Sequence, residues 1–297
     1  MKTPLFTGSN VAIVTPMHPD LSVNFEKLGE LIEFQIANGT SAITICGTTG
    51  ESSTLKDPEH LAAIRYTVEK VAGRVPVIAG TGSNETPHAI ELSQEAASFG
   101  ADGLLLVTPY YNKCTPKGLI RHYTSIVDAA NIPAIVYNVP SRTGVSMSVQ
   151  VYQELSKHPL INGVKEASGS TGLVLRTRAA CGDDLNIWSG NDDQIVPLMS
   201  VGAKGIISVL ANICPKETAQ IANACLTGDY ATAAKMQVAY MELIDALFCE
   251  VNPIPVKTAM NLMGTEVGPL RMPLCEMESA NLARLKAAMT AQGLKLA

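Results

Sequence analysis

The chain has 297 residues, 46% of them hydrophobic and 16% charged, so it can bury a substantial core as one large domain with an appendage, or as two domains. Its formal net charge of -5 argues against nucleic-acid binding, which requires a clustered basic surface. No low-complexity tract or long block of like charge indicates disorder.

Seven cysteines are spread along the chain without a Cys-x-x-Cys pair, so we expect free thiols in a reducing compartment. The first residues lack the apolar core of a signal peptide, and no stretch approaches the roughly 18 apolar residues that a membrane span requires. These features predict a cytoplasmic protein.

Short apolar segments recur at intervals of roughly 30 residues, and a polar cluster follows each of them. Their continuous Val, Ile and Leu character is typical of strands that are covered on both faces, so parallel pairing is expected. The predicted strands span residues 11–15, 42–46, 76–80, 103–107, 133–137, 161–165, 185–189 and 205–209.

Helical patterns with recognisable starts separate these segments. Asp57-Pro58 supplies an N-cap and a first-turn proline, and Thr115-Pro116 opens a similar segment; apolar residues recur at helical spacing after both. Thr86-Pro87 is expected to open another helix. Eight strand-then-helix units in succession predict a (β/α)8 TIM barrel, which typically takes about 250 residues. We therefore expect a catalytic barrel domain over residues 1–225, and additional C-terminal helices that form a helical domain over residues 226–297.

An open doubly wound sheet is the alternative to a closed barrel. Gly80-Thr81-Gly82 follows the third predicted strand, where a dinucleotide-binding loop would begin, but Glu85 occupies the position of the third glycine. A dinucleotide site therefore has little support.

Lys165 closes the apolar run of the sixth predicted strand. In a barrel, chemistry gathers at the carboxyl ends of the strands. Burial there disfavours the ammonium form, so the free amine becomes available for carbonyl chemistry. A plain structural lysine is the alternative; most lysines are solvated, and Lys113, Lys204 and Lys257 offer no comparable strand-end context. Glu166 points to the opposite face of the strand and is expected to serve packing or to support the site from behind.

Two side chains from the neighbouring fifth strand complete the candidate site. Tyr137 ends that strand, so its phenol can enter the same mouth and move protons, although most tyrosines serve packing. Arg142 in the following loop can clamp a carboxylate bidentately, and a surface arginine is the simpler interpretation.

Thr48 and Thr49 lie between two glycines after the second strand, where hydroxyl and backbone N–H groups can meet a small anion. A tight turn with satisfied hydroxyls is the simpler interpretation. Asp192 and Asp193 follow the seventh strand without companion ligands, so helix capping is favoured over a metal site, and no metal is predicted. Because the last two strand ends lack a glycine-rich phosphate cradle, a carboxylate substrate without a phosphate is expected.

The whole chain from Gly8 onward resembles the pyruvate-dependent class I aldolases that contain dihydrodipicolinate synthase and N-acetylneuraminate lyase. The motifs that carry the resemblance are Gly47-Thr48-Thr49-Gly50-Glu51, Tyr137-Asn138-Val139-Pro140, Gly163-Val164-Lys165-Glu166-Ala167-Ser168 and Asn252-Pro253-Ile254-Pro255-Val256-Lys257. Within the family, Arg142 and the Tyr110-Tyr111 pair are similar to the synthase branch.

The resemblance implies that pyruvate forms a Schiff base with Lys165 and then attacks L-aspartate 4-semialdehyde, which gives 4-hydroxy-tetrahydrodipicolinate for lysine and diaminopimelate biosynthesis. It also implies roles for individual residues. Tyr137 carries protons, Thr48 links it to Tyr111 of a neighbouring subunit, and Arg142 receives the semialdehyde carboxylate. The pyruvate-binding residues are implied to be Thr49, Gly190 and Ile207.

No metal or organic cofactor is implied, because the iminium itself is the electron sink. A tyrosine shared across an interface implies a homo-oligomer, and the family usually forms a tetramer that is a dimer of dimers. Inhibited relatives bind lysine at a subunit interface, and the corresponding candidate effector residues here are Ser52, His60, Asn84, His88 and Tyr110. Because His88 stands where inhibited members carry a glutamate, and Asp57 is expected to cap a helix, weak or absent lysine inhibition is predicted.

Two rival functions remain open. One is another aldolase of the same scaffold, an N-acetylneuraminate or 2-keto-3-deoxy sugar acid lyase, against which Arg142 and Tyr111 weigh. The other is a non-catalytic barrel that binds a metabolite, and the intact set of candidate catalytic residues argues against it.

Overall fold

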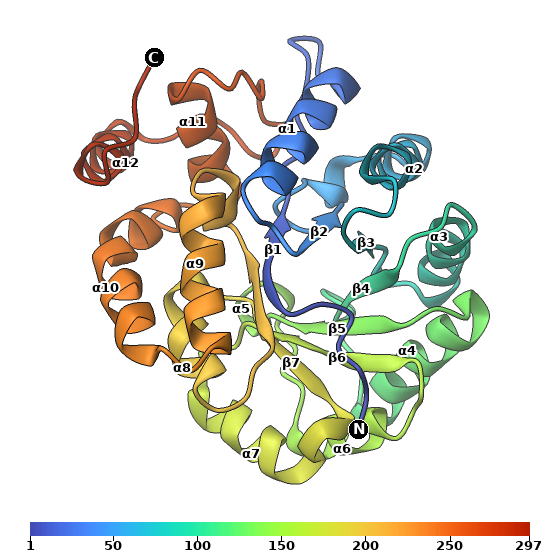
Figure 1. The fold of residues 1–297 in the computed structure, drawn as a ribbon. Coiled ribbons are helices and arrows are strands. Elements are labelled where there is room, and N and C mark those ends of the chain that lie inside the picture. Colours follow the sequence, from blue (N-terminus) through green and yellow to red (C-terminus); the bar gives the residue numbers. More distant parts are fainter.

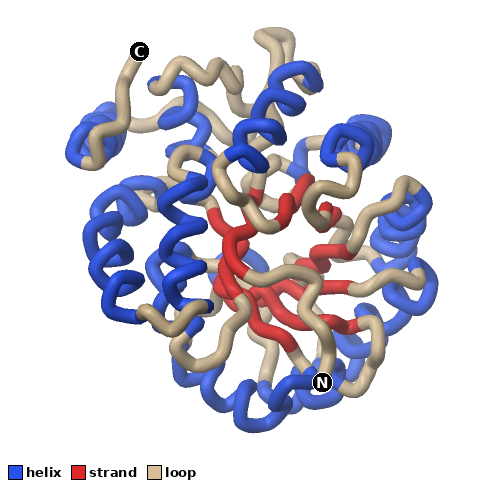
Figure 2. Tube along the Cα trace, in the orientation of Figure 1, coloured by secondary structure: helices blue, strands red, loops and turns tan.

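The computed structural model describes residues 1–297 as a closed barrel of parallel strands surrounded by helices (Figures 1 and 2). The strands pair in chain order, and β8 returns to β1, which closes the barrel and rules out the open sheet. The strands are β1 (Gly8–Ala12), β2 (Ala42–Ile45), β3 (Val77–Gly80), β4 (Gly103–Val107), β5 (Ala134–Asn138), β6 (Ile161–Glu166), β7 (Asn186–Ser189) and β8 (Gly205–Ser208).

The helices cover the outside of the barrel and continue beyond it at the C-terminus. They are α1 (Phe25–Ala37), α2 (Asp57–Val71), α3 (Thr86–Ser98), α4 (Pro116–Ala130), α5 (Pro140–Thr143), α6 (Val149–Ser156), α7 (Thr171–Cys181), α8 (Ile195–Met199), α9 (Pro215–Leu226), α10 (Tyr230–Leu247), α11 (Ile254–Leu262) and α12 (Ser279–Ala291). Short 3-10 turns η1 (Ser52–Thr54), η2 (Gly182–Asp184), η3 (Asp192–Gln194) and η4 (Leu210–Asn212) lie in the loops. The prediction of a (β/α)8 barrel with additional C-terminal helices is confirmed.

Seven of the predicted strands agree with the structure within one residue at each end, but the first strand begins three residues earlier than predicted. Its first half contains Ser9 and Asn10, which are polar and yet fully buried. The apolar pattern therefore hid this half of the strand. The barrel closes tightly here, because a Cβ added to Gly205 would lie 1.9 Å from the carbonyl oxygen of Gly8.

The start of α2 also differs from the prediction. Lys56 is the residue before the helix, and Glu59 accepts a hydrogen bond from its backbone N at 3.4 Å. Asp57 is already the first helical residue, and its Oδ1 lies 3.0 Å from Nε2 of His88 on α3. The prediction that Asp57 caps the helix was therefore wrong. Thr115 does cap α4, since its hydroxyl accepts from the backbone N of Gly118 at 3.2 Å.

Side chains fill the barrel interior below the mouth. Trp188 on β7 is fully buried, stacks on Phe6 with ring centres 5.0 Å apart, and donates to the carbonyl oxygen of Phe6 at 3.2 Å. Gly163 makes room for this indole, because a Cβ there would lie 2.6 Å from the Trp188 ring. The barrel is thus a packed core, and ligands can enter only at its mouth.

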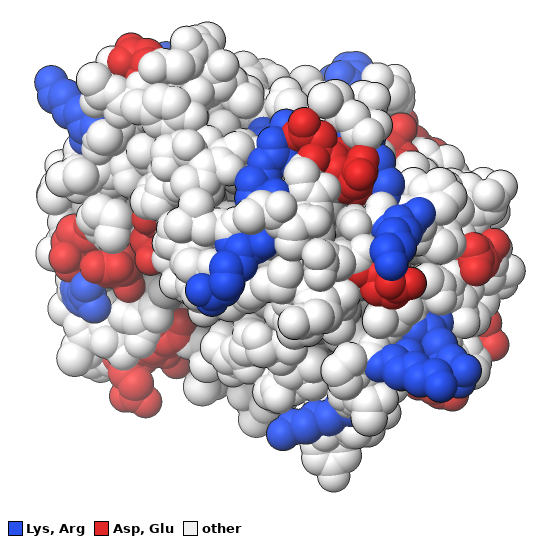
Figure 3. Space-filling model, turned by 90° about the horizontal axis from the view of Figure 1, so that it is seen from below, with Lys and Arg blue, Asp and Glu red and all other residues white.

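The surface carries charged side chains of both signs. Basic and acidic side chains are interspersed on the face shown in Figure 3. None of the helices is both long enough and apolar enough to span a bilayer. The domain boundary near residue 225 stays a prediction, although α9 ends at Leu226 and α10 to α12 follow it.

Candidate active site

Lys165 and Tyr137 lie side by side at the mouth of the barrel. They are partners in the register of β5 and β6, and the Lys165 Nζ is 4.4 Å from the centre of the Tyr137 ring. Both side chains are buried, with 5% and 6% of their surface exposed. Gly190 leaves space for the lysine stem, since a Cβ there would lie 3.1 Å from Cγ and Cε of Lys165. The amine and the phenol thus share one enclosed space.

The environment of Lys165 favours the free amine. The pKa of Lys165 is lowered from 10.5 to about 8, mainly by burial; the charge of Asp192 opposes this shift, and the charge of Arg142 contributes to it. A desolvated lysine of this kind is a nucleophile for carbonyl carbons at near-neutral pH.

The same environment acts on the phenol of Tyr137. Burial raises its pKa, whereas the nearby Arg142 charge and a hydrogen bond with Thr48 lower it. The phenol therefore stays protonated at neutral pH, and it can donate a proton and recover it.

The turn after β2 carries Thr48 and Thr49. The backbone N of Gly50 donates to the carbonyl oxygen of Gly47 at 3.0 Å, so the segment is a tight turn, as the simpler interpretation predicted. The hydroxyl of Thr49 is buried and accepts from Nδ2 of Asn252 at 3.0 Å. Thr48 is half-buried and faces the mouth cavity.

Arg142 lies on α5, is exposed, and lines the same cavity as Thr48. Its NH2 group donates to the carbonyl oxygen of Asn252 at 3.1 Å, and the remaining donors stay available for a carboxylate. Asn252 therefore contacts both Thr49 and Arg142. Sequence reasoning missed Asn252 as a site residue, although it begins the Asn252-Pro253 motif.

Glu166 supports the site from the outer face of β6. Its carboxylate accepts from Nδ2 of Asn138 at 3.1 Å, from the hydroxyl of Tyr152 at 2.6 Å and from the backbone N of Ser168 at 2.8 Å. These bonds tie β5, α6 and the loop after β6 around the strand that carries Lys165. The expectation that Glu166 is a packing or supporting residue agrees with this network.

Asp192 is buried and caps a turn on the neighbouring strand. Its carboxylate accepts from the backbone N of Val209 and of Leu210, both at 3.0 Å, and from the hydroxyl of Ser208 at 2.5 Å. The prediction that these aspartates cap the helix that begins there was therefore wrong, because η3 starts after Asn191 without a side-chain cap and Asp192 instead bonds the start of η4. No group of three or more His, Cys, Asp and Glu side chains is arranged to hold a metal ion.

A cavity of about 450 Å³ opens from the mouth toward α2 and α3. Thr48 and Arg142 line one end of it. The predicted effector residues Ser52, His60, Asn84, His88 and Tyr110 all line the same cavity. The cavity also contains Asp57, which lies beside His88, so a carboxylate faces this space after all.

Three other predicted site residues lie in different surroundings from one another. Tyr111 is 91% exposed and has a φ of 66°. The backbone N of Gly190 donates to the carbonyl oxygen of Glu166 at 2.8 Å. Ile207 lies in β8 with its side chain in the barrel interior.

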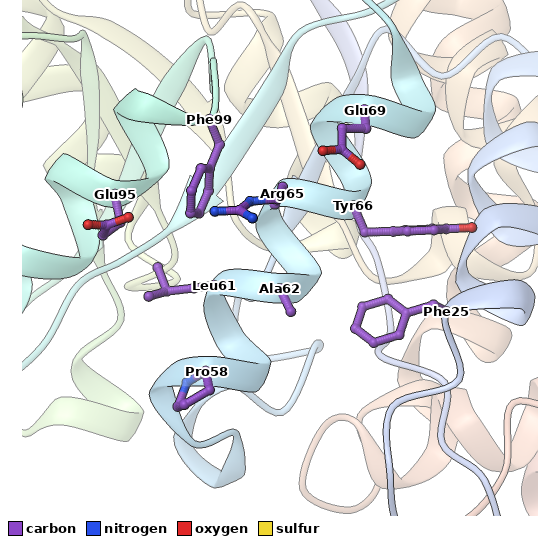
Figure 4. A pocket seen from close by; sticks show the side chains of 9 residues that line it. All are labelled: Phe25, Pro58, Leu61, Ala62, Arg65, Tyr66, Glu69, Glu95 and Phe99. Atoms are coloured by element: carbon purple, nitrogen blue, oxygen red, sulfur yellow. The ribbon is translucent and has the colours of Figure 1, made fainter.

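A second cavity, of about 410 Å³, lies on the outer surface between α1, α2 and α3 (Figure 4). Phe25 and Tyr66 line one side of it, and the guanidinium carbon of Arg65 is 4.3 Å from the centre of the Phe99 ring. It holds no pair of groups arranged for acid–base or nucleophilic chemistry. The barrel mouth is therefore the candidate active site.

A (β/α)8 barrel with a desolvated lysine beside a buried phenol has the architecture of a class I aldolase. The comparisons with known proteins narrow this class. The chain belongs to the dihydrodipicolinate synthetase family, whose model matches residues 5–292.

Individual relatives are similar over the full chain. A 4-hydroxy-tetrahydrodipicolinate synthase of Thermoanaerobacter sp. (strain X514) is 56% identical over 292 residues, which are 98% of each chain. Among solved structures, the chloride-inhibited dihydrodipicolinate synthase of Acinetobacter baumannii in complex with pyruvate is 41% identical, with a TM-score of 0.95 over 97% of this chain and 99% of that one. The synthase of Cyanidioschyzon merolae with lysine bound is 37% identical, with a TM-score of 0.95 over 99% and 100% of the two chains.

Proposed function

We propose that this protein is a lyase that condenses pyruvate with L-aspartate 4-semialdehyde to 4-hydroxy-tetrahydrodipicolinate, a step of lysine and diaminopimelate biosynthesis. The observation that carries the proposal is the buried Lys165 amine beside Tyr137, with a pKa lowered to about 8. The full-length similarity to 4-hydroxy-tetrahydrodipicolinate synthases supports the choice of substrates.

In the proposed reaction, the free amine of Lys165 attacks the keto carbon of pyruvate. Loss of water gives an iminium, which withdraws electrons so that a methyl proton can leave and an enamine forms. The enamine carbon attacks the aldehyde of the second substrate. The amine of that substrate then closes the ring onto the imine carbon and releases Lys165. The iminium is the electron sink, so the proposed mechanism uses no metal or organic cofactor.

Tyr137 is proposed to carry the protons of these steps. Its phenol adjoins the amine, and Thr48 lies within hydrogen-bonding reach of it. General acid–base help of this kind is typically worth about 10²- to 10⁴-fold in rate. Thr49 and the backbone near Gly190 and Ile207 are proposed to hold the pyruvate carboxylate.

Arg142 is proposed to hold the carboxylate of the semialdehyde. A guanidinium binds a carboxylate through two parallel hydrogen bonds, and Asn252 occupies only one donor of Arg142. This residue therefore favours the semialdehyde over a neutral sugar aldehyde as the second substrate.

The proposed assembly is a homotetramer that is a dimer of dimers. Tyr111 is exposed on a projecting loop, a placement that suits a residue donated to a neighbouring subunit. The cavity that contains His60 and His88 is proposed as an effector site, and it is a lysine-bound relative that suggests the ligand.

An assay of the purified protein tests the proposal. Pyruvate should turn over with aspartate semialdehyde, and much less with N-acetylmannosamine. Borohydride added with pyruvate should label Lys165 alone, as peptide mass spectrometry can show. Labelling at another lysine, or full activity of a Lys165→Ala variant, would contradict the imine mechanism.

A further inference from the structure

Two buried charged residues lie next to the site and have no part in the proposed reaction. Lys257 on α11 and Glu51 after β2 form an ion pair, with Nζ and Oε1 2.7 Å apart and both side chains at most 1% exposed. The Lys257 ammonium also donates to the carbonyl oxygens of Pro269 at 2.6 Å and Thr15 at 3.2 Å. All of its three N–H groups are therefore satisfied, which a buried charge requires.

The pair lies beside the turn that carries Thr48 and Thr49. Glu51 has a left-handed backbone with φ of 54°, which is uncommon for a residue other than glycine. Its second carboxylate oxygen accepts from the backbone N of Arg271 at 3.0 Å. The hydroxyl of Thr15 donates to the carbonyl oxygen of Gly50 at 2.6 Å, so the strained corner is held from two sides.

The C-terminal segment that supplies these partners also reaches the site at Asn252. This residue holds the hydroxyl of Thr49 through its side chain and the guanidinium of Arg142 through its carbonyl oxygen. Arg271, farther along the segment, forms a bidentate pair with Glu59 of α2, at 2.6 and 2.9 Å. The segment from Asn252 to Arg271 is therefore bonded to the turn, to the carboxylate clamp and to α2.

We propose that Glu51 and Lys257 are positioning residues, which hold the Thr48–Thr49 turn in its conformation at the mouth of the barrel. The C-terminal segment that carries Lys257 thereby contributes to the geometry of the active site. The proposal rests on the proposed function. A buried ion pair is weak support for stability, because well-packed apolar side chains of similar volume often replace it without loss. Its value here is geometric, since the carboxylate can bond both partners only when the turn has its present conformation.

The sharpest test is the double variant Glu51→Leu/Lys257→Met. It removes both charges and retains most of the bulk, so the protein should stay folded. Its Tm should be lower than that of the original chain, because the backbone N of Arg271 and the carbonyl oxygens of Thr15 and Pro269 each lose a hydrogen-bond partner. The turn loses its anchor, so kcat should fall about 10- to 100-fold, the usual effect of a misplacement near 1 Å. The KM for pyruvate should rise, while borohydride still traps pyruvate on Lys165 when pyruvate is saturating.

A second neutral variant, Glu51→Gln/Lys257→Met, keeps the test decisive if the first double variant does not fold. It retains the shape of Glu51 and an acceptor for the backbone N of Arg271, so its kcat should lie between those of the original chain and the first double variant. The matched control is Glu33→Gln/Arg74→Met, which removes an exposed ion pair of 2.7 Å between Glu33 on α1 and Arg74 in the loop after α2. The control should leave kcat and both KM values unchanged.

The proposal is overturned if either folded variant of the buried pair has the kcat and KM values of the original chain. It is also overturned if the control loses as much activity as the buried pair. Failure of the proposed function would be visible separately, because the original chain would then neither turn over the two substrates nor trap pyruvate on Lys165.

Discussion

The pH dependence of imine formation tests the state of Lys165 directly. Burial and the charge of Arg142 lower the pKa of Lys165 from 10.5 to about 8. Only the free amine attacks the keto carbon, so the rate of imine formation should rise with pH and level off above the pKa. The charged form should dominate, and the rate should fall, as the pH drops below about 8.

The lowered pKa has a large effect near neutrality. At pH 7, an amine with a pKa of about 8 is about 10% unprotonated, whereas one with a pKa of 10.5 is only about 0.03% unprotonated. Burial at the barrel mouth therefore increases the concentration of the nucleophile roughly 300-fold, because each unit of pKa corresponds to a factor of ten.

Timed quenching with borohydride measures this rate. Lys165 labelled by pyruvate would be quantified by peptide mass spectrometry at pH values from about 6 to about 10, a range that brackets the lowered pKa. In Arg142→Met the midpoint should move upward, because a positive charge that opposes protonation is lost. Arg121→Met, which removes an exposed arginine of α4, should leave the midpoint unchanged. A midpoint near the ordinary lysine pKa in the original chain would refute the reasoning.

The other predictions concern the remaining side chains of the mouth. Tyr137→Phe should retain the fold and lose about 10²- to 10⁴-fold in kcat in a coupled assay, and an unchanged rate would reduce the phenol to packing. Arg142→Ala should raise the KM for the semialdehyde much more than that for pyruvate, so equal damage to both would contradict a selective clamp. L-Lysine should inhibit weakly, because His88 cannot pair with an ammonium and the Asp57 carboxylate is already paired with His88. The loss of a charge-assisted bond costs roughly 1.5 to 3 kcal/mol, or about 10- to 150-fold in affinity, so half-inhibition at sub-millimolar lysine would show that this argument is wrong.

Much of the fold could be predicted from the sequence because strands that are buried on both faces carry continuous apolar runs. The first strand shows the limit of this signal. Ser9 and Asn10 are fully buried in it, although their side chains suggest a loop. The same limit applies to Asp57, which was predicted to cap α2 but instead lies inside the helix, with its side chain against His88 on α3.

The core of the candidate site was predictable for a different reason. Parallel strands bring their carboxyl ends to one edge, so Tyr137 and Lys165 at neighbouring strand ends had to lie close together. Asn252 and Lys257 carry no such signal. They reach Thr49 and Glu51 from more than 200 positions away, and only the packing of α11 against the barrel brings them there. Lys257, interpreted as an ordinary structural lysine, is in fact completely buried.

Arg142 connects the two halves of the proposed reaction. Its charge lowers the pKa of both Lys165 and Tyr137, and the same guanidinium is the proposed clamp for the semialdehyde carboxylate. A carboxylate bound there would offset this charge, so the pKa of the free Lys165 amine would rise and the nucleophile would become scarcer. The fraction of Lys165 in the free-amine form that attacks pyruvate is therefore greatest while no carboxylate is bound to Arg142. Once the iminium has formed, the lysine no longer needs a low pKa, and the clamp can accept the second substrate without a loss of nucleophile. The electrostatics of the mouth thus favour an order in which pyruvate binds before the semialdehyde.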